Sequence, residues 1–371
     1  MSTFILQLDA PGDGPRLAVK DLIDVAGVPT TAGCRAVART AAPAAADAAC
    51  LNGARAAGAR IVGKTNLHEL AVFPFGTNPW FGTPVNPLDP ALVPGGSSSG
   101  SAVAVANDDA DVALGTDTGG SVRIPAACCG VVGLKTTHGR IPCTGVWPLA
   151  PSLDTVGPLA RDVAGVRLGM ELLEPGFRAG PPARRIGRLR TVGDPAIEAA
   201  VDAALRQAGL DVVDVELDLA SGAECFTAIY FAELWDADHR LLEADPEGVG
   251  PDVAEAIRMA PLFAPGAEDA RRRVPAWRES LRALFDAVEL LALPTLPIAP
   301  PRLDALTGDL LPLVIDLTRH TSPFNAAGVP CSAQPVPCPG SAVPASLQLV
   351  GPHGAEERLV ATAALIEAAL S

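Results

Sequence analysis

The sequence predicts a layered α/β fold, in which short strands alternate with helices around one large core. Apolar residues make up 49% of the 371 positions and charged residues 19%, which is the composition of a globular chain that can bury a sizeable core. Short apolar runs alternate with segments of good helix formers along the chain. No internal repeat or flexible linker divides the sequence, so we expect one domain over residues 1–371.

In the first half, the alternation begins with a predicted helix at residues 47–58. This helix ends at Gly58, a typical C-terminal cap, and residues 59–64 follow as a short buried strand. The small residues at 100–108 predict a second helix. The further predicted strands of this half are residues 110–117 and 130–135.

The second half continues the pattern with amphipathic helices between strands. The predicted strands are residues 184–190, 210–217, 289–295 and 345–352. The predicted helices are residues 194–209, 268–287 and 355–370. We expect the proline-rich stretches at 174–184 and 293–303 to be long turns within the domain.

The charge balance disfavours nucleic acid as a partner. Lysine and arginine number 28 against 42 aspartates and glutamates, which gives a net charge of −14 that would repel an anionic polymer. The single basic run, residues 271–273, is expected to be a solvated helix face. No segment approaches 18 uninterrupted apolar residues, so we expect no membrane span.

The cysteines and the first residues indicate a reducing compartment. None of the eight cysteines forms a CxxC pair, and the start of the chain lacks the basic and apolar regions of a secretory leader. The neighbours Cys128 and Cys129 are expected to be buried packing residues without metal-ligand spacing. We therefore expect a cytoplasmic protein that needs no metal or other cofactor.

Lysine is rare in a way that bears on chemistry. Only three of the 28 basic residues are lysines, namely Lys20, Lys64 and Lys135, and the others are arginines. A buried ammonium can lose its proton, whereas a guanidinium stays protonated. Each retained lysine is therefore a candidate for a role that arginine cannot fill, with chance survival as the alternative.

Two short motif matches point to chemistry that their surroundings disfavour. Residues 58–65, GARIVGKT, match the phosphate-binding GxxxxGK[ST] pattern, but Ile61 and Val62 read as a strand that follows a helix. Residues 96–100, GSSSG, match the GxSxG elbow of α/β-hydrolases, which would make Ser98 the nucleophile. That elbow should follow a central strand, and here it follows a proline-rich segment.

A third pattern joins Lys20 with serines that follow two glycine pairs. A serine hydroxyl needs a base to become a nucleophile, and a desolvated lysine can supply one where no histidine is near. Ser121 follows Gly119 and Gly120 in the stretch TDTGGS, whose successive backbone N–H groups can point into one concavity that suits an oxyanion. A second serine, after Gly95 and Gly96, can relay the proton between them.

Through these residues the chain resembles the amidase signature family over most of its length. The strongest stretches are LAVKDLIDVAGVPTTAG, VPGGSSSGSAVAVA, LGTDTGGSVRIPAACCGVVGLKTTHGRIP and PLAPSLDTVGPLARD, with weaker agreement in TSPFNAAGVPCSAQPVP and ASLQLVGPHGAEERLV. The resemblance implies a large twisted mixed β-sheet with helices on both faces. It also implies a signature core at about 15–165 and a C-terminal part at about 166–371 that completes the sheet and the pocket.

The resemblance implies a role for each residue of the third pattern. Lys20 would be the base, Ser97 the bridging serine and Ser121 the acylated nucleophile, and the 24 positions from Ser97 to Ser121 agree with the family motif. The peptide bond from Gly96 to Ser97 should be cis. The oxyanion hole would consist of the backbone amides of Thr118, Gly119, Gly120 and Ser121, and the supporting residues would be Ser98, Thr116, Asp117, Arg123 and Thr155.

Some features of the sequence depart from the usual family pattern. Only 19 residues precede Lys20, where many members have a longer helical lead, and the C-terminal part is compact, so the pocket walls are expected to differ. The short lead, with GTPVNP, GGSSSGSAVAVA and HGRIP, is most similar to plant-type indole-3-acetamide amidases. That similarity points to small aryl-acetamides as substrates.

Three functions from different classes follow from the sequence. The first is an amidohydrolase that cleaves a small amide to a carboxylate and ammonia. The second is the glutaminase subunit of a tRNA-dependent amidotransferase, which would require partner proteins. The third, a binding protein without turnover, is disfavoured because Lys20, Ser97 and Ser121 are all present. We expect a small-molecule amide as the partner, no nucleic acid and no membrane, and we leave a homodimer open.

Overall fold

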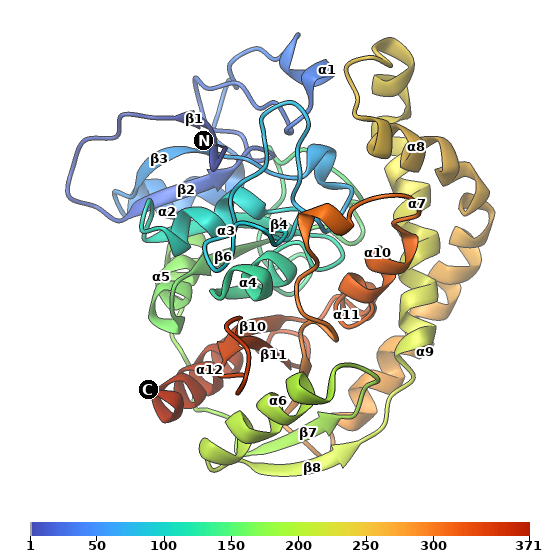
Figure 1. The fold of residues 1–371 in the computed structure, drawn as a ribbon. Helices are drawn as coiled ribbons and strands as arrows, with labels where there is room; N and C mark the ends of the chain where they lie inside the picture. Colours follow the sequence, from blue (N-terminus) through green and yellow to red (C-terminus); the bar gives the residue numbers. More distant parts are fainter. Residues whose placement is uncertain (1) are drawn as a thin grey trace.

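The computed structural model describes residues 2–371, and a single mixed sheet of eleven strands runs through them (Figure 1). In sheet order the strands are β1 (Phe4–Gln7), β3 (Arg60–Thr65), β2 (Arg16–Lys20), β4 (Val112–Asp117), β6 (Thr155–Ala160), β5 (Val132–Lys135), β10 (Cys331–Val336), β11 (Ala345–Val350), β9 (Leu290–Pro294), β7 (Arg185–Leu189) and β8 (Asp211–Val215). Strand β5 pairs antiparallel with β10, with Lys135 opposite Cys331. The first and second halves of the chain therefore share one sheet.

The order of the strands places two polar residues at one edge of the sheet. Strand β2 lies between β3 and β4 and runs parallel to both, with Val19 opposite Lys64 on one side and Leu114 on the other. The carboxyl ends of parallel neighbours lie at the same edge. Lys20 at the end of β2 and Asp117 at the end of β4 therefore come close together.

Both faces of the sheet are covered by helices, and the strand residues alternate between the two cores accordingly. Leu17 and Val19 of β2 belong to one core cluster, whereas Ala18 between them belongs to another. Strand β9 alternates in the same way, with Leu290 facing the first core and Leu291 the opposite one. This period of two confirms the predicted sandwich of a sheet between helical layers.

The helices of each layer pack against neighbours in the same layer. On one face lie α2 (Asn52–Ala56), α5 (Val163–Leu173), α6 (Pro195–Gln207) and α12 (Glu356–Leu370). On the other lie α3 (Ser99–Ala106), α4 (Arg123–Cys129), α7 (Leu219–Ala244), α9 (Ala267–Leu284) and α11 (Ser322–Ala327). Figure 1 shows the long helices α7 and α9 along the right-hand side of the molecule.

The remaining helices are short. They are α1 (Arg35–Ala38), α8 (Pro251–Met259), α10 (Leu311–Thr318) and the 3-10 turns η1 (Ala49–Leu51), η2 (Glu69–Ala71), η3 (Ala260–Leu262), η4 (Ala264–Gly266) and η5 (Leu303–Ala305). Three longer helices begin at side-chain caps. Asp162 accepts a hydrogen bond from Gly165 N at the start of α5, Asp194 accepts one from Ala196 N at the start of α6, and Asp218 accepts one from Ala220 N at the start of α7.

Most of the predicted strands and helices are confirmed, with boundaries a few residues shorter. The helix expected at 47–58 is two pieces, η1 and α2, and it ends before Gly58, which takes the left-handed conformation with φ +70°. No predicted element covers the strands β1, β2, β6 and β10, the 26-residue helix α7, or the helices α1, α4, α5, α8, α10 and α11. Strand β6 lies between β4 and β5 in the sheet.

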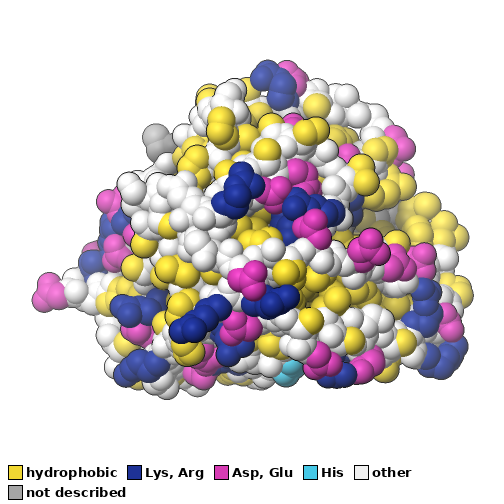
Figure 2. Space-filling model, turned by 90° about the horizontal axis from the view of Figure 1, so that it is seen from below, with side chains coloured by type: hydrophobic (Ala, Val, Ile, Leu, Met, Phe, Trp, Pro, Cys, Tyr) yellow, Lys and Arg dark blue, Asp and Glu magenta, His cyan; other side chains and the backbone are white. Residues whose placement is uncertain are grey.

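The surface carries charges of both signs. On the face seen from below in Figure 2, arginine side chains are interspersed with carboxylates and hydrophobic patches, without a continuous basic area. The eight cysteines are all free thiols. Among residues 2–371, no helix combines the length and apolar character needed to cross a membrane.

Candidate active site

Lys20 occupies a buried position because the strand before it is apolar. Leu17, Ala18 and Val19 are fully buried between β3 and β4, and the side chain of Lys20 is 0% exposed. Its Nζ lies 2.7 Å from Oγ of Ser97 and 2.8 Å from Oγ1 of Thr116. The amine is therefore held between two hydroxyl groups.

Burial changes the acidity of this amine. Desolvation lowers the pKa of Lys20 to about 7, even though the carboxylates of Asp117 and Asp154 act in the opposite direction. An unperturbed lysine titrates far higher, at ~10.4. A substantial fraction of Lys20 is therefore neutral at neutral pH.

Ser97 directly follows the cis peptide bond that was predicted. The bond from Gly96 to Ser97 is cis, and the side chain of Ser97 is 0% exposed. The carbonyl of Ser97 accepts a hydrogen bond from His68 N at 3.0 Å. A Cβ atom at Gly96 would lie 2.6 Å from the backbone nitrogen of Gly76, so this position has room for glycine only.

Ser121 lies on the loop between β4 and α4, next to the segment that carries Ser97. The backbone N–H of Ser98 donates to the carbonyl of Ser121 at 3.2 Å and joins the two segments. Ser121 retains 8% exposure, whereas Ser97 and Lys20 are fully buried. Of the three residues, Ser121 is thus the one that a molecule from solvent can reach.

The four backbone amides predicted for the oxyanion hole are not equivalent. The N–H of Gly120 donates to Oδ1 of Asp117 at 2.9 Å, so in this structure it is already engaged. Within residues 2–371, the N–H groups of Thr118, Gly119 and Ser121 have no hydrogen-bond acceptor. Three of the four donors therefore remain available.

A buried ion pair holds this loop in place. The guanidinium of Arg123 meets the carboxylate of Asp117 with two contacts, Nη2 to Oδ1 at 2.9 Å and Nε to Oδ2 at 3.0 Å, and both side chains are 0% exposed. Burial alone would raise the pKa of Asp117, but Arg123, with help from Lys135 and Asn325, holds that pKa well below its usual range. The carboxylate stays ionised and also accepts from Val122 N at 3.1 Å.

The other predicted supporting residues join the same cluster. Ser98 Oγ donates to the carbonyl of Thr116 at 3.2 Å, and Thr155 Oγ1 donates to the carbonyl of Asp117 at 2.8 Å. Both bonds attach neighbouring segments to the end of β4. The structure therefore brings every predicted site residue together around the loop of residues 118–121.

Several residues of this cluster were not predicted. Thr321 Oγ1 donates to the carbonyl of Gly119 at 2.6 Å, and Thr118 Oγ1 donates to Asp154 at 2.6 Å. Asn325 and Gln348 accept from Arg123 at 2.5 Å and 2.7 Å. Asp154, Thr321, Asn325 and Gln348 all lie within stretches that carried the family resemblance, but their spacing along the chain gave no sign that they meet at this loop.

Phe226 is a further unpredicted neighbour, and no pattern in the sequence marks it. A Cβ atom at Gly119 would lie 2.6 Å from Cζ of Phe226, so the ring packs directly on this glycine. Phe226 stacks on Tyr230 with ring centroids 5.3 Å apart, and Tyr230 is fixed through its hydroxyl, which donates to the carbonyl of Val72. Helix α7 thus adds an aromatic wall beside the loop.

The two misleading motif matches have structural explanations. Lys64 lies on strand β3 itself and forms a buried ion pair with Asp21 at 2.8 Å, so the GxxxxGK[ST] match is not a phosphate-binding loop. The segment before Ser98 forms no strand, which removes the context of a hydrolase elbow. Lys135 donates to the carbonyls of Val329 and Thr136, and all three lysines of the chain are 0% exposed.

Comparison with known proteins assigns this arrangement to a family. The family model described as Amidase matches residues 13–176 and 181–360. The chain belongs to the amidase family. The amidase is therefore an enzyme that hydrolyses C–N bonds, and its fold is the one expected from the resemblance.

Individual relatives cover most of the amidase. A glutamyl-tRNA(Gln) amidotransferase subunit of Halobacterium salinarum is 33% identical over 417 residues, which span 97% of this chain and 96% of the relative. The solved structure of 6-aminohexanoate cyclic dimer hydrolase has a TM-score of 0.88 at 26% identity and covers 99% of this chain and 89% of that one.

The similarity to plant enzymes is more local. Amidase 1 of Oryza sativa subsp. japonica is 48% identical over 165 residues, which span 44% of this chain and 38% of the relative. The plant-type resemblance is thus supported over part of the chain only.

No three His, Cys, Asp or Glu side chains within the described range 2–371 are grouped so that they could hold a metal ion.

Proposed function

We propose that this amidase hydrolyses a small primary amide, R–CONH2, to a carboxylate and ammonia, with the whole chain acting as one domain. The observation that carries the proposal is the contact of 2.7 Å between Lys20 Nζ and Ser97 Oγ, both fully buried beside the loop that holds Ser121. A neutral lysine amine can accept a proton there, which an arginine could not do. We assign Lys20 as the base, Ser97 as the proton relay and Ser121 as the nucleophile.

The reaction would proceed through an acyl-enzyme. Ser121 Oγ attacks the amide carbon and forms a C–O bond, while its proton passes to Ser97 and the proton of Ser97 passes to Lys20. The proton then returns through the relay to the amide nitrogen, the C–N bond breaks and ammonia leaves. Water attacks the ester by the same path, which releases the carboxylate and restores Ser121.

The tetrahedral intermediate needs hydrogen-bond donors for its negative oxygen. We assign this role to the N–H groups of Thr118, Gly119 and Ser121, because the N–H of Gly120 is engaged by Asp117. Two contacts keep the loop in shape, the hydroxyl of Thr321 on the carbonyl of Gly119 and the carboxylate of Asp117. A preformed loop of this kind stabilises charge without reorganisation during the reaction.

The walls of the site favour an apolar, aromatic acyl group. The ring of Phe226 lies on Gly119, two positions from Ser121, and it continues into a row of rings through Tyr230 and Phe231 to Phe263. Aromatic rings pack well in offset or edge-to-face contacts with one another. We therefore propose small aryl-acetamides as the substrate class.

The relatives support a second candidate function. The glutamyl-tRNA(Gln) amidotransferase relative of Halobacterium salinarum aligns with 97% of this chain, so the glutaminase component of such an assembly is the alternative. That function requires partner proteins and glutamine. The small-molecule hydrolase requires neither, and for it we propose no nucleic-acid partner.

A substrate panel separates the two functions. The purified chain alone is incubated with indole-3-acetamide, phenylacetamide, benzamide, malonamate and glutamine, and ammonia release is measured. We expect the two aryl-acetamides to give the highest kcat/KM. Phe226→Ala should raise KM for them, whereas Phe231→Ala, further along α7, should have a smaller effect. If glutamine were the only one of the five amides from which ammonia is released, the result would instead favour the amidotransferase function.

A covalent probe tests the nucleophile independently of the substrate. A fluorophosphonate should label wild type on Ser121, and Ser121→Ala should lose both labelling and turnover while keeping its circular dichroism spectrum. Mass spectrometry of the adduct locates the modified serine. An adduct on Ser98 would contradict the assignment and support the α/β-hydrolase elbow.

A further inference from the structure

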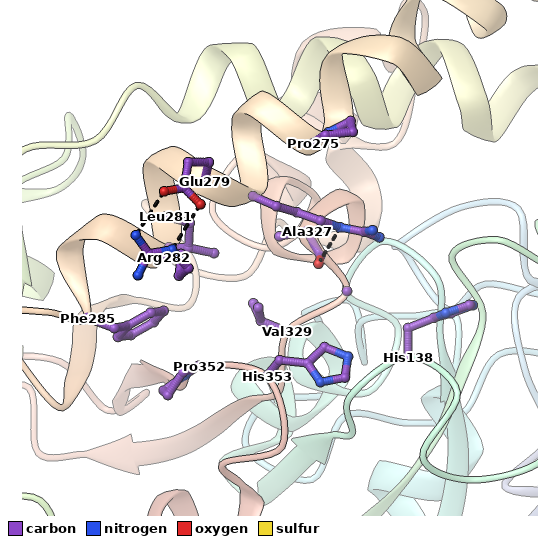
Figure 3. A pocket seen from close by; sticks show the side chains of 12 residues that line it. His138, Pro275, Glu279, Leu281, Arg282, Phe285, Ala327, Val329, Pro352 and His353 are labelled. Atoms are coloured by element: carbon purple, nitrogen blue, oxygen red, sulfur yellow. Dashed lines mark hydrogen bonds and ion pairs between the residues drawn. The ribbon is translucent and has the colours of Figure 1, made fainter.

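A second cavity lies away from the candidate active site and contains none of its residues. Its volume is about 490 Å³, which is within the usual size of small-molecule sites. It lies between helix α9, the end of α11, the turn after β11 and the loop after β5 (Figure 3). The lining residues are His138, Pro275, Arg278, Glu279, Leu281, Arg282, Phe285, Ala327, Gly328, Val329, Pro352 and His353.

One part of this cavity is apolar and firmly built. Leu281 and Val329 are buried, and Phe285 and Pro352 complete the wall in Figure 3. The carbonyl of Val329 accepts a hydrogen bond from the buried Lys135 at 2.8 Å, which fixes the backbone at this point. An apolar group of a ligand would therefore find a preformed surface.

The opposite part carries groups that can bind an anion. Arg278 donates through Nε to the carbonyl of Ala327 at 3.0 Å, and its Nη atoms have no hydrogen-bond acceptor within residues 2–371. A Cβ atom at Gly328 would lie 3.4 Å from Cβ of His138 and 3.5 Å from Nη2 of Arg278, so these two side chains flank this glycine. His353 adds a second imidazole to the same cavity.

The other charged residues of the cavity are paired with one another or with a neighbour. Figure 3 shows Glu279 and Arg282 engaged with one another on α9, at a distance of 2.8 Å, and Arg282 also meets Asp286 at 3.2 Å. Arg278 forms no ion pair with any carboxylate of the described chain. Of the two arginines that line the cavity, Arg278 is therefore the one whose guanidinium has no carboxylate partner within residues 2–371.

We propose that this cavity binds a small organic monocarboxylate with an apolar or aromatic body. The two free Nη groups of Arg278 match the geometry of a carboxylate, and the imidazole of His353 can add a hydrogen bond, whereas His138 is engaged through Nε2 with the carbonyl of Pro151 at 3.1 Å. The body of the ligand would lie against Leu281, Phe285 and Val329. The proposal does not depend on the roles assigned to Lys20, Ser97 and Ser121.

Calorimetric titration of the full chain with phenylacetate tests the proposal. We expect binding at one site in this cavity that weakens at least about tenfold in Arg278→Gln and remains unchanged in Arg272→Gln, a matched exposed arginine of the same helix outside the cavity. Benzyl alcohol, which lacks the carboxylate, and inorganic phosphate, which lacks the apolar body, should each bind at least about tenfold more weakly than phenylacetate.

Three results would overturn the proposal. They are unchanged phenylacetate affinity in Arg278→Gln, no binding at millimolar concentration, and a crystal structure with phenylacetate beside Ser121 only. Phenylacetate is also the product expected from phenylacetamide, so binding that Arg278→Gln leaves unchanged would be assigned to the candidate active site. A failure of the hydrolase assignment would appear in the amide panel, so the two hypotheses can be judged separately.

Discussion

The amine nitrogen of Lys20 lies 2.7 Å from the hydroxyl oxygen of Ser97, and neither side chain has any exposed surface. This contact joins a strand end to a loop 77 positions further along the chain. It makes the protonation state of a single buried amine the first quantity to measure.

Activity should depend on Lys20 being neutral. Since burial lowers its pKa to about 7, kcat/KM should rise with pH through about 7 and level off above it. Lys20→Arg should lose activity nearly as completely as Lys20→Ala, because arginine keeps its proton. The profile from pH 5 to pH 10 checks both points, and a Lys20→Arg enzyme with near-wild-type rates would show that charge alone is needed.

Removal of the relay hydroxyl should be less severe than removal of the base. In Ser97→Ala a water molecule can bridge Ser121 and Lys20, so we expect a loss in kcat/KM on the order of 10² to 10⁴, as is typical for acid–base groups. The rise near pH 7 should persist because Lys20 remains. Steady-state kinetics of the variant across the same pH range measures both, and a wild-type rate would contradict the relay.

The ion pair of Arg123 and Asp117 should be needed for stability. Arg123→Gln would leave a fully buried carboxylate without its guanidinium, which typically costs about 3–5 kcal/mol. The exposed pair of Arg302 and Asp304 offers a control, since Arg302→Gln should cost less than about 1 kcal/mol. Urea denaturation of the three proteins compares the values, and equal losses would contradict the assignment.

Asp238 on α7 should make stability depend on pH. It is 0% exposed, and burial raises its pKa to about 7 despite a hydrogen bond from Trp147. The pKa of Asp238 in the folded state lies above its unfolded value of about 3.9, so between these two pH values the folded state holds an extra proton. The free energy of unfolding therefore falls as pH rises through that window. Asp238→Asn should therefore gain about 2–3 kcal/mol relative to wild type between pH 5 and pH 8.

The control for Asp238 is Asp236→Asn, an exposed position of the same helix. Its free energy of unfolding, measured in urea at each pH, should follow that of wild type. If the difference between Asp238→Asn and wild type stayed constant from pH 5 to pH 8, the protonated state of Asp238 in the fold would be disproved.

The parts of the site that the sequence predicted are those encoded in continuous stretches. Lys20, the glycine pair before Ser97 and the TDTGGS loop each lie in such a stretch, and the resemblance to the amidase signature family implied that they meet. Thr321 and Asn325 could not be placed, because they reach the loop only after β10 pairs with β5 across the middle of the sheet. That pairing joins residues almost 200 positions apart and leaves no periodic trace in the sequence.

Two other features depended on details that composition does not reveal. The N–H of Gly120 is not free to bind an oxyanion because it donates to the carboxylate of Asp117. The sequence does not show that this carboxylate, three residues earlier, folds back on its own loop. Helix α7 was missed because it packs against α8, α9 and α11, so its apolar residues do not follow a single stripe. The aromatic wall of Phe226 was missed with it.

The burial of all three lysines gives the folded chain an unusual chemical property. Each of them lies within the described residues and has no exposed surface, so an acylating or alkylating reagent in solution finds no lysine amine to attack. Trypsin likewise has only arginines to recognise while the fold is intact. Modification at Lys20, Lys64 or Lys135 therefore requires local opening, and its rate at each residue would report how often β2, β3 or β5 becomes accessible to the reagent.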